Sequence, residues 1–273
     1  MIIDFHTHLF PEKVAANAIK TLEERAKIKA YTDGTESGLY SSMCKLDSRN
    51  KPCVDISIVL PVVTNPLKTN HFNEFAQKLN EKYAKSNPKI ISFAGIHPDT
   101  PDYKSVIKNI ASSGFKGIKL HPDYQNTFID DIRYEKIIEE AECYKLITVV
   151  HAGIDIGLPE PVHCPPEKAQ RLIDDVHPNH LVLAHMGGWK QWNNVENYLV
   201  GQNVYFDTAS TDSYLSSEQF TRIVKTHGAD KILFATDSPW SGQLETISMI
   251  NALPLSDEEK IMILGGNAER LLF

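Results

Sequence analysis

Short apolar and β-branched runs recur along the chain, and each is followed by a turn and a longer stretch with helical hydrophobic spacing. This alternation is typical of repeated βα units around a parallel sheet. The predicted strands are residues 2–5, 54–60, 90–95, 117–120, 147–150, 181–184, 204–207 and 232–235. The predicted helices are residues 11–29, 71–85, 103–112, 131–144, 166–176, 189–199, 217–226 and 242–251, with short closing helices at 257–264 and 267–272. The pattern therefore predicts an α/β fold.

The number of βα units favours a barrel over an open sheet. Eight consecutive units are what a (β/α)8 TIM barrel requires, whereas an open doubly wound sheet has no such count. The length of 273 residues is close to the roughly 250 residues of a typical barrel. We therefore expect one (β/α)8 barrel domain over residues 1–273. Residues 30–42 are predicted to form a long loop before a second short helix, either as a lid over a substrate or as a plain surface loop.

Charge and hydropathy limit the classes of partner. The net charge of -7, without a cluster of Lys and Arg, argues against nucleic acid and against an anionic membrane. No apolar run approaches the roughly 18 residues that a membrane span requires, and the N-terminus does not resemble a signal peptide. The four cysteines include no close pair, so we expect reduced thiols. These features predict a cytoplasmic protein with a small-molecule substrate, and a homodimer remains open.

Histidines and one aspartate stand at the ends of predicted strands. His6 and His8 end the first strand two residues apart, so the period of two places both rings on the same face. His151 and His185 directly follow two later strands, and Asp237 follows the last strand one residue further along. In a barrel these ends converge on one mouth, where imidazole and carboxylate groups can bind a metal ion. The positions together predict a metal or catalytic site.

Several longer motifs run from one end of the chain to the other. They are Asp4-Phe5-His6-Thr7-His8, Gly117-Ile118-Lys119-Leu120-His121-Pro122, Val150-His151-Ala152-Gly153, Ala184-His185-Met186-Gly187-Gly188, Thr236-Asp237-Ser238-Pro239-Trp240 and Gly266-Asn267-Ala268-Glu269-Arg270-Leu271-Leu272. In order and spacing these motifs resemble the amidohydrolase superfamily. The resemblance is to the Amidohydrolase 2 (ACMSD-like) family of metal-dependent hydrolases.

The resemblance implies a metallo-dependent hydrolase barrel with one divalent ion held by His6, His8, His151 and Asp237. Zinc is the expected ion, and another divalent metal or a second ion stays open. The resemblance places His185 beside the metal, either as a residue that transfers a proton or polarises the substrate, or as a further ligand. Asp237 is expected to accept a proton from water and pass it to the leaving group.

Lys119 lies near the place where dinuclear relatives carry a carboxylated lysine that bridges two metals. The form Lys-Leu-His-Pro, with His121 as neighbour, is more similar to the mononuclear branch. Lys119 is therefore a candidate for a substrate-anion contact, for a packed and paired barrel lysine, or for the bridging role.

Other residues are candidates for substrate binding. His97 and His121 follow strands three and four, so they either line the pocket or are satisfied histidines of the barrel rim. His163 lies in a proline-rich loop, where a surface position is favoured over a substrate contact or a pairing with Cys164. Trp240, three residues after Asp237, either forms a wall of the pocket or plugs the top of the barrel.

The chemistry expected of such a site is hydrolysis. A divalent ion lowers the pKa of bound water enough to supply hydroxide near neutral pH. An amide, lactone or ester of a small molecule is the expected substrate. Non-oxidative decarboxylation of an aromatic or unsaturated acid is the alternative within the same family. Few arginines follow the strands, which favours hydrolysis, whereas Arg or Lys facing the pocket would favour an acid substrate.

Two other classes stay open. A TatD-like or PHP-like phosphoesterase also begins with an Asp-x-His-x-His strand, but Lys119 and His121 stand where TatD proteins have a bridging glutamate. The acidic net charge also disfavours polynucleotide substrates. A barrel that only binds a ligand is disfavoured by the presence of the complete set of candidate metal ligands.

Overall fold

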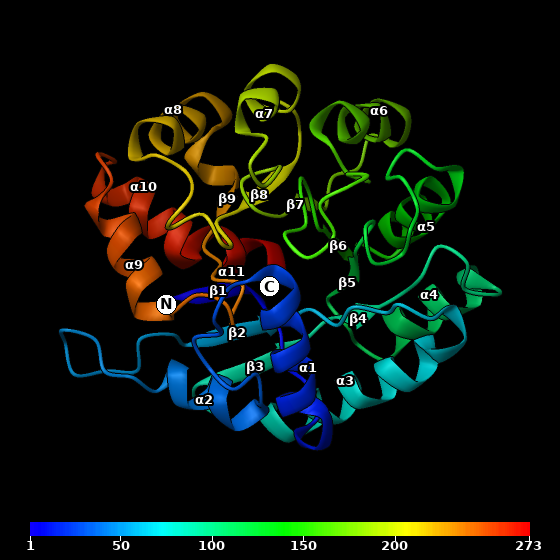
Figure 1. The fold of residues 1–273 in the computed structure, drawn as a ribbon, viewed down its shortest axis with the longest axis horizontal. Coiled ribbons are helices and arrows are strands. Elements are labelled where there is room, and N and C mark those ends of the chain that lie inside the picture. The colour runs from blue at the N-terminus through cyan, green and yellow to red at the C-terminus, as the bar shows by residue number, and fades with distance from the viewer.

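The computed structural model describes residues 1–273 and alternates strands with helices almost throughout. The strands are β1 (Ile3–Thr7), β2 (Ile56–Val59), β3 (Lys89–Ser92), β4 (Ala94–Gly95), β5 (Gly117–Leu120), β6 (Ile147–Val150), β7 (Leu181–Leu183), β8 (Tyr205–Asp207) and β9 (Ile232–Leu233). The helices are α1 (Glu12–Ala26), α2 (Glu36–Met43), α3 (Thr69–Tyr83), α4 (Tyr103–Ser112), α5 (Ile132–Cys143), α6 (Pro166–Val176), α7 (Trp192–Tyr198), α8 (Ser217–His227), α9 (Gln243–Ala252), α10 (Asp257–Ile261) and α11 (Asn267–Leu272). The helices form an outer ring around the strands (Figure 1).

The strands pair in parallel and close into a barrel. One run of pairing is β1-β2-β3 and the other is β4-β5-β6-β7-β8-β9. β3 and β4 are two halves of one predicted strand, separated only by Phe93. After β9 the chain returns to β1, where Phe5 N donates to Phe234 O at 2.8 Å and Asp237 N donates to His6 O at 2.8 Å. With β3 and β4 counted as one strand, the fold is the expected (β/α)8 barrel.

Apolar side chains form two cores on the two faces of the sheet. An inner cluster of 15 buried residues, including Phe5, Val149 and Leu233, fills the barrel, and Leu272 of α11 closes one end of it. A second cluster of 48 buried residues, including Ile118 and Leu120, packs between strands and helices. Because side chains alternate along a strand, residue 119 of β5 faces the inside of the barrel, and its register partner on β6 is Val149.

The connection between β1 and β2 differs from the prediction. Residues 36–43 form α2 instead of the end of a long loop, and the Oγ1 atom of Thr35 caps this helix by accepting a hydrogen bond from Gly38 N at 3.0 Å. The loop before α2 makes hydrogen bonds to residues that follow β9 in the sequence. Tyr31 N donates to Pro239 O at 2.6 Å, and Tyr31 Oη donates to Glu245 of α9 at 2.8 Å. This segment is therefore anchored at both its backbone and its side chain.

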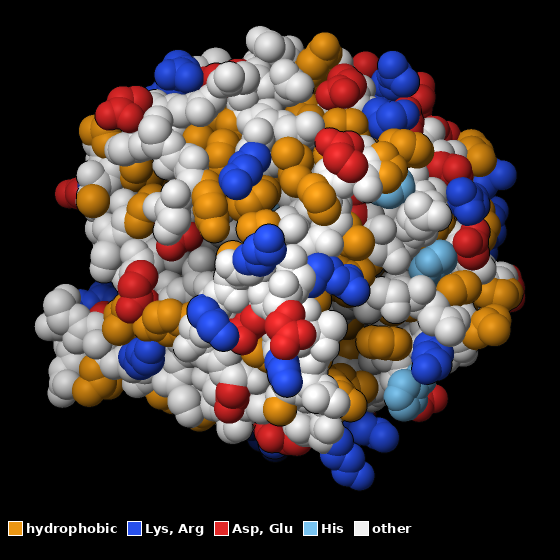
Figure 2. Space-filling view, in the orientation of Figure 1, with side chains coloured by type: hydrophobic (Ala, Val, Ile, Leu, Met, Phe, Trp, Pro, Cys, Tyr) orange, Lys and Arg blue, Asp and Glu red, His pale blue; other side chains and the backbone are white.

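Charged side chains of both signs lie on the surface. On the face shown in Figure 2, blue Lys and Arg side chains are interspersed with red Asp and Glu side chains, without a continuous basic stripe. None of the helices combines the length and the apolar character that crossing a bilayer demands.

Candidate metal centre and active site

An irregularity in β1 aims His6 into the mouth of the barrel. Phe5 belongs to the inner core, so strict alternation would turn His6 to the outer face together with Asp4. The register of β1 against β2 shifts between Asp4 and Thr7, which marks a β-bulge. Bulges commonly re-aim a side chain next to a functional site. The His6 side chain consequently lies inside, at 1% exposure.

The donor atoms of His6, His8 and Asp237 lie within 4.8 Å of one another, and we call these residues the first donor group. The Nε2 atoms of His6 and His8 are 3.0 Å apart. Asp237 Oδ1 is 3.2 Å from His8 Nε2 and 3.6 Å from His6 Nε2. The side chains of His8 and Asp237 keep 18% and 14% exposure, so a small molecule can approach this group from their side.

The hydrogen bonds of the two rings leave their lone pairs facing one another. His6 Nδ1 donates to Asp207 Oδ2 at 2.9 Å, and His8 Nδ1 donates to Leu60 O at 2.8 Å. A neutral imidazole that donates from Nδ1 has an unprotonated Nε2. Two lone pairs and a carboxylate oxygen at these distances repel one another unless a cation lies between them. The first donor group therefore fits a divalent ion that prefers nitrogen and oxygen ligands, such as zinc or manganese.

Asp207 is a functional candidate that the sequence analysis did not single out. It is the last residue of β8 and fully buried. Besides the bond from His6, its Oδ1 atom accepts hydrogen bonds from the backbone N–H groups of His185 at 2.9 Å and Ala209 at 3.1 Å. A carboxylate that accepts the second ring N–H is the usual partner of a metal-binding histidine. Its position at a strand end was the same signal that identified the histidines.

His185 lies between the first donor group and His151. Its ring centroid is 5.3 Å from that of His6. His185 Nδ1 donates to Ala209 O at 2.9 Å, and its Nε2 atom is 3.0 Å from His151 Nδ1. The carbonyl oxygen of Ala209 can only accept, so His185 carries its proton on Nδ1 when neutral and Nε2 accepts from His151.

The structure groups His151 with different neighbours from those that the resemblance implies. The ring of His151 stacks on that of His121, with centroids 4.2 Å apart and an interplanar angle of 8°. The donor atoms of His121, His151 and Asp155 lie within 4.8 Å of one another, and we call these residues the second donor group. The role of His151 as a ligand beside His6 and His8 stays a prediction.

Lys119 brings a positive charge into the centre of the site. Its side chain is 1% exposed, and Nζ donates to His6 Nε2 at 3.2 Å. Burial lowers the pKa of Lys119 to about 8, against the opposing effect of the negative charges of Asp207 and Asp237. The ammonium form therefore still prevails at neutral pH, in a place where no ion pair compensates it.

Asp237 is held in its ionised form. Burial raises its pKa, but the contact with His8 Nε2 at 3.2 Å and the neighbouring rings of His6 and His185 lower it by more, to well below the ordinary value. Its second oxygen, Oδ2, accepts a hydrogen bond from Ser210 Oγ at 2.8 Å. The carboxylate can thus bind a cation through Oδ1 while Ser210 fixes its orientation.

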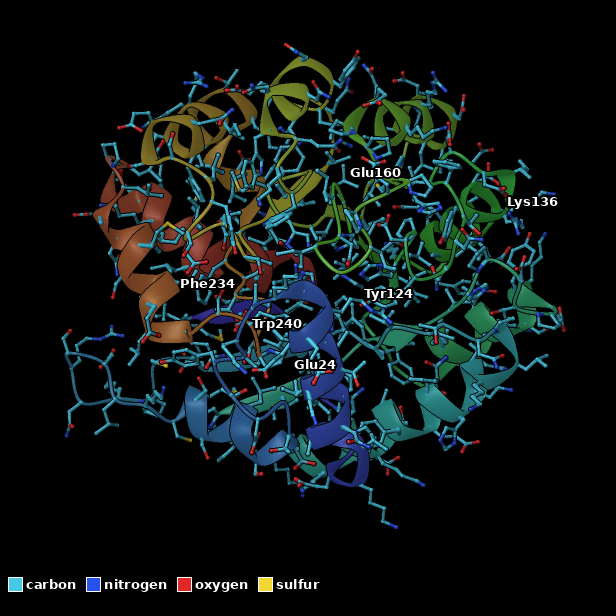
Figure 3. The ribbon with its side chains drawn as sticks, in the orientation of Figure 1. Glu24, Tyr124, Lys136, Glu160, Phe234 and Trp240 are labelled. Atoms are coloured by element: carbon cyan, nitrogen blue, oxygen red, sulfur yellow. The ribbon has the colours of Figure 1, made fainter.

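The remaining candidates take different positions. His97 accepts a hydrogen bond from Asp99 N at 3.1 Å and so folds back on its own turn. His163 is only 6% exposed, and its Nδ1 atom donates to Asp123 Oδ1 at 3.1 Å. The favoured surface position of His163 is therefore wrong, because its loop folds inward onto Asp123. Trp240 is half-buried in the loop between β9 and α9, and Figure 3 labels it near the middle of the ring.

The comparison with known families agrees with this geometry. A family model described as Amidohydrolase, of the Amidohydrolase 2 type, matches residues 3–273. The chain belongs to the amidohydrolase family. It is accordingly an enzyme of the amidohydrolase superfamily. A search of curated proteins found no match to this chain.

Solved structures share the barrel over nearly the whole chain. The 2,6-dihydroxybenzoate decarboxylase from Rhizobium is 17% identical, with a TM-score of 0.70 and coverage of 99% of this chain and 98% of that chain. A dihydroxybenzoic acid decarboxylase from a Polaromonas species, with bound manganese and the inhibitor 2-nitroresorcinol, is 15% identical, with a TM-score of 0.71 and coverage of 99% and 96%. An uncharacterised TIM-barrel protein from Bordetella bronchiseptica is 17% identical, with a TM-score of 0.74 and coverage of 99% and 98%. At these identities the likeness establishes the fold.

Proposed function

We propose that this amidohydrolase-family enzyme is a divalent-metal-dependent, non-oxidative decarboxylase of a small aromatic or unsaturated carboxylic acid. The observation that carries the proposal is the Lys119 ammonium, buried beside the first donor group with only an imidazole as partner. A buried positive charge is costly unless an anion pairs with it, and a substrate carboxylate supplies that anion. The sequence-based preference for hydrolysis rested on the scarcity of arginines, and Lys119 removes that argument.

The structures of similar fold add support, because several of them are decarboxylases of hydroxylated aromatic acids. The Polaromonas enzyme contains manganese, whereas the sequence analysis expects zinc. The nitrogen and oxygen donors of His6, His8 and Asp237 suit either ion. We therefore propose a divalent ion at the first donor group, where it would supply a Lewis acid that orients oxygen atoms of the substrate.

The side chains around this ion divide the remaining tasks. Lys119 Nζ would pair with the substrate carboxylate and hold it inside the mouth of the barrel. In the reaction, the bond between the carboxyl carbon and its neighbour breaks, CO2 leaves, and the neighbouring carbon takes up a proton. His185 Nε2 is the atom that would hold and deliver this proton, because the carbonyl group of Ala209 keeps Nδ1 protonated. While Nε2 holds the proton, His151 Nδ1 would accept from it and His151 would carry its own proton on Nε2.

The proposal is tested by incubating the purified protein, with manganese or zinc, with a panel of hydroxybenzoic and unsaturated acids. We expect CO2 release and the decarboxylated product from at least one acid, and loss of both in Asp237→Asn. In Lys119→Met the KM for the acid should rise about tenfold or more while kcat changes less, because the lost ion pair acts in binding.

Hydrolysis is the second candidate, because the ionised Asp237 carboxylate is placed to accept a proton from water. The same protein is therefore assayed with aryl esters, lactones, amides and an aryl phosphate. Turnover of one of these compounds without CO2 release from any acid would contradict the decarboxylase proposal.

A further inference from the structure

Trp189 connects three of the loops that surround the mouth of the barrel. It lies in the loop after β7, and its backbone N donates to Ala152 O in the loop after β6 at 2.9 Å. Its side chain turns to the loop after β8, where Nε1 donates to Ser210 O at 3.1 Å. Ala152 directly follows His151. Trp189 therefore links the segment of a predicted metal ligand to the segment of Ser210.

The backbone of Ser210 has a conformation that needs support. Its φ is +53°, in the left-handed region where the Cβ atom of an L-residue is crowded by the backbone. Such a conformation persists where surrounding contacts fix it. Two successive carbonyl groups of this turn accept side-chain N–H groups from the loop after β7. Ala209 O accepts from His185 Nδ1 at 2.9 Å. Ser210 O accepts from the indole of Trp189, which is thus one of the two donors that hold the turn.

In this conformation the hydroxyl group of Ser210 reaches the carboxylate of Asp237. Ser210 Oγ donates to Asp237 Oδ2 at 2.8 Å, while Asp237 Oδ1 lies 3.2 Å from His8 Nε2 in the first donor group. Asp237 also has a left-handed backbone, with φ +64°. A change of Ser210 to an ordinary φ would move its hydroxyl group relative to Asp237. The carboxylate would then lose the contact that fixes its second oxygen.

The indole ring of Trp189 has little freedom to turn. The residue is 6% exposed, and the ring of Tyr214 meets it edge to face with the centroids 5.0 Å apart. Lys190 Nζ lies 4.4 Å from the centroid of the indole, a distance at which a cation is attracted to the face of the ring. The indole N–H can only donate, and the carbonyl oxygen of Ser210 is its acceptor. A fixed ring therefore fixes Ser210 in turn.

We propose that Trp189 is a positioning residue for the metal centre and acts through Ser210 on the orientation of Asp237. The indole N–H sets the place of the Ser210 hydroxyl group, and this hydroxyl group sets the direction of Asp237 Oδ1. Trp189 itself contributes no ligand to the ion. This role rests on the metal centre of the proposed function and is the same for decarboxylation and for hydrolysis.

The test is the affinity of the full-length protein for Zn2+ and Mn2+, measured by competition with a chelator of known strength. Trp189→Phe removes the N–H group and keeps an aromatic ring, whereas Ser210→Ala removes the hydroxyl group. Groups that orient metal ligands are worth about 10–100-fold in affinity, so we expect a loss of about tenfold in Ser210→Ala and about three- to tenfold in Trp189→Phe. The double variant should bind about as weakly as Ser210→Ala alone, because two residues that act in one chain are not additive.

Tyr134→Phe is the matched control. It also removes one hydrogen-bond donor from a buried aromatic residue, but Tyr134 Oη donates to Gln125 Oε1 at 2.7 Å, in the loop after β5. Its metal affinity should equal that of the wild type. Urea unfolding of the metal-free proteins separates positioning from stability, because a purely structural tryptophan would lower stability and leave the affinity of the folded protein unchanged.

The outcomes separate this role from the metal centre itself. Unchanged affinity in Trp189→Phe overturns the role, and so does a double variant in which the two losses multiply. An equal loss in Tyr134→Phe overturns it as well. In each of these cases Asp237→Asn still loses the ion, and the metal centre stands. Binding that survives in Asp237→Asn contradicts the metal centre and the role of Trp189 together.

A measurement without Trp189→Phe decides the question where that variant does not fold. The chain has three tryptophans, so with 15N-labelled tryptophan the indole resonance of Trp189 is identified as the one that remains in both Trp192→Phe and Trp240→Phe. An ion at Asp237 Oδ1 draws charge from Oδ2 and so changes the hydrogen bonds that run through Ser210 to the indole. We expect this resonance to shift when Zn2+ is added, and to shift much less in Ser210→Ala. A resonance that does not respond to Zn2+, or shifts equally in both proteins, overturns the role.

Discussion

Asp207→Asn is expected to weaken metal binding at the first donor group although Asp207 is not a ligand. Two backbone N–H groups point at its Oδ1 atom, so the amide oxygen of an asparagine must stay there. The amide NH2 then faces His6 Nδ1, which is 2.9 Å from Oδ2 in the native protein. Since an NH2 group donates, the His6 proton moves from Nδ1 to Nε2, and Nε2 can no longer bind an ion.

The expected loss of metal affinity depends on what the hydrogen bond between His6 and Asp207 does for the ligand. Carboxylates that orient metal-binding histidines are worth about 10–100-fold in metal affinity. We expect the upper part of this range, about 2–3 kcal/mol at 1.4 kcal/mol per tenfold, because the substitution reverses the tautomer instead of only removing a bond. The affinity is measured by competition for Zn2+ or Mn2+ with a chelator of known strength.

The control is Asp4→Asn. Asp4 is also a fully buried aspartate, but it accepts hydrogen bonds from Thr236 and Gln243 and none from a histidine ring. Its variant should bind metal about as tightly as the wild type. Unchanged affinity in Asp207→Asn, or an equal loss in Asp4→Asn, would refute the tautomer argument.

Three further predictions concern charge, backbone and pH. Lys119→Met removes an ammonium group 3.2 Å from His6 Nε2, so we expect chelator competition to show tighter metal binding at the first donor group, and weaker binding would contradict the repulsion. Gly153→Ala should destabilise the fold by about 2 kcal/mol or more in urea unfolding. Gly153 has φ +84°, and a Cβ atom there would lie 2.1 Å from Trp189 N. A smaller loss of stability would show that the loops after β6 and β7 can move apart. Burial lowers the pKa of His227 from 6.5 to about 4, so the unfolded chain takes up the proton at a higher pH than the folded protein. Wild-type stability should therefore decrease as the pH is lowered from 6.5 to 4, by up to about 1.4 kcal/mol per pH unit. Urea unfolding should show a shallower fall in His227→Gln, and equal slopes would count against a buried neutral ring.

The strands were predictable where pattern alone defines them. β5 and β6 have the predicted bounds, because each is a short apolar run between clear turns. The predicted strand 90–95 is divided at Phe93 since β3 pairs with β2 and β4 pairs with β5, and periodicity contains no information on pairing partners. The second short helix was predicted to begin after residue 42, whereas α2 begins at Glu36. Its start was placed too late because Glu36–Met43 has a weak hydrophobic pattern, although Thr35 and Glu36 form a recognisable helix start.

The site was predictable where strand ends determine it. His6, His8 and Asp237 lie together because the ends of β1 and β9 are neighbours in the closed barrel. The bulge that turns His6 inward depends on the register with β2, which the sequence does not reveal. The grouping of His151 with His121 and Asp155 depends on the loops after β5 and β6, whose course is set by the long-range contact between Asp123 and His163. Such contacts have no local signature.

The central claim is that the rings of His6 and His8 and the carboxylate of Asp237 surround a divalent ion. Anomalous diffraction at the manganese edge, from crystals grown with Mn2+, tests it most directly. The account predicts a peak about 2.0–2.2 Å from His6 Nε2, His8 Nε2 and Asp237 Oδ1, which disappears in Asp237→Asn. A manganese-loaded crystal without a peak between these atoms, or a peak unchanged in Asp237→Asn, would contradict it.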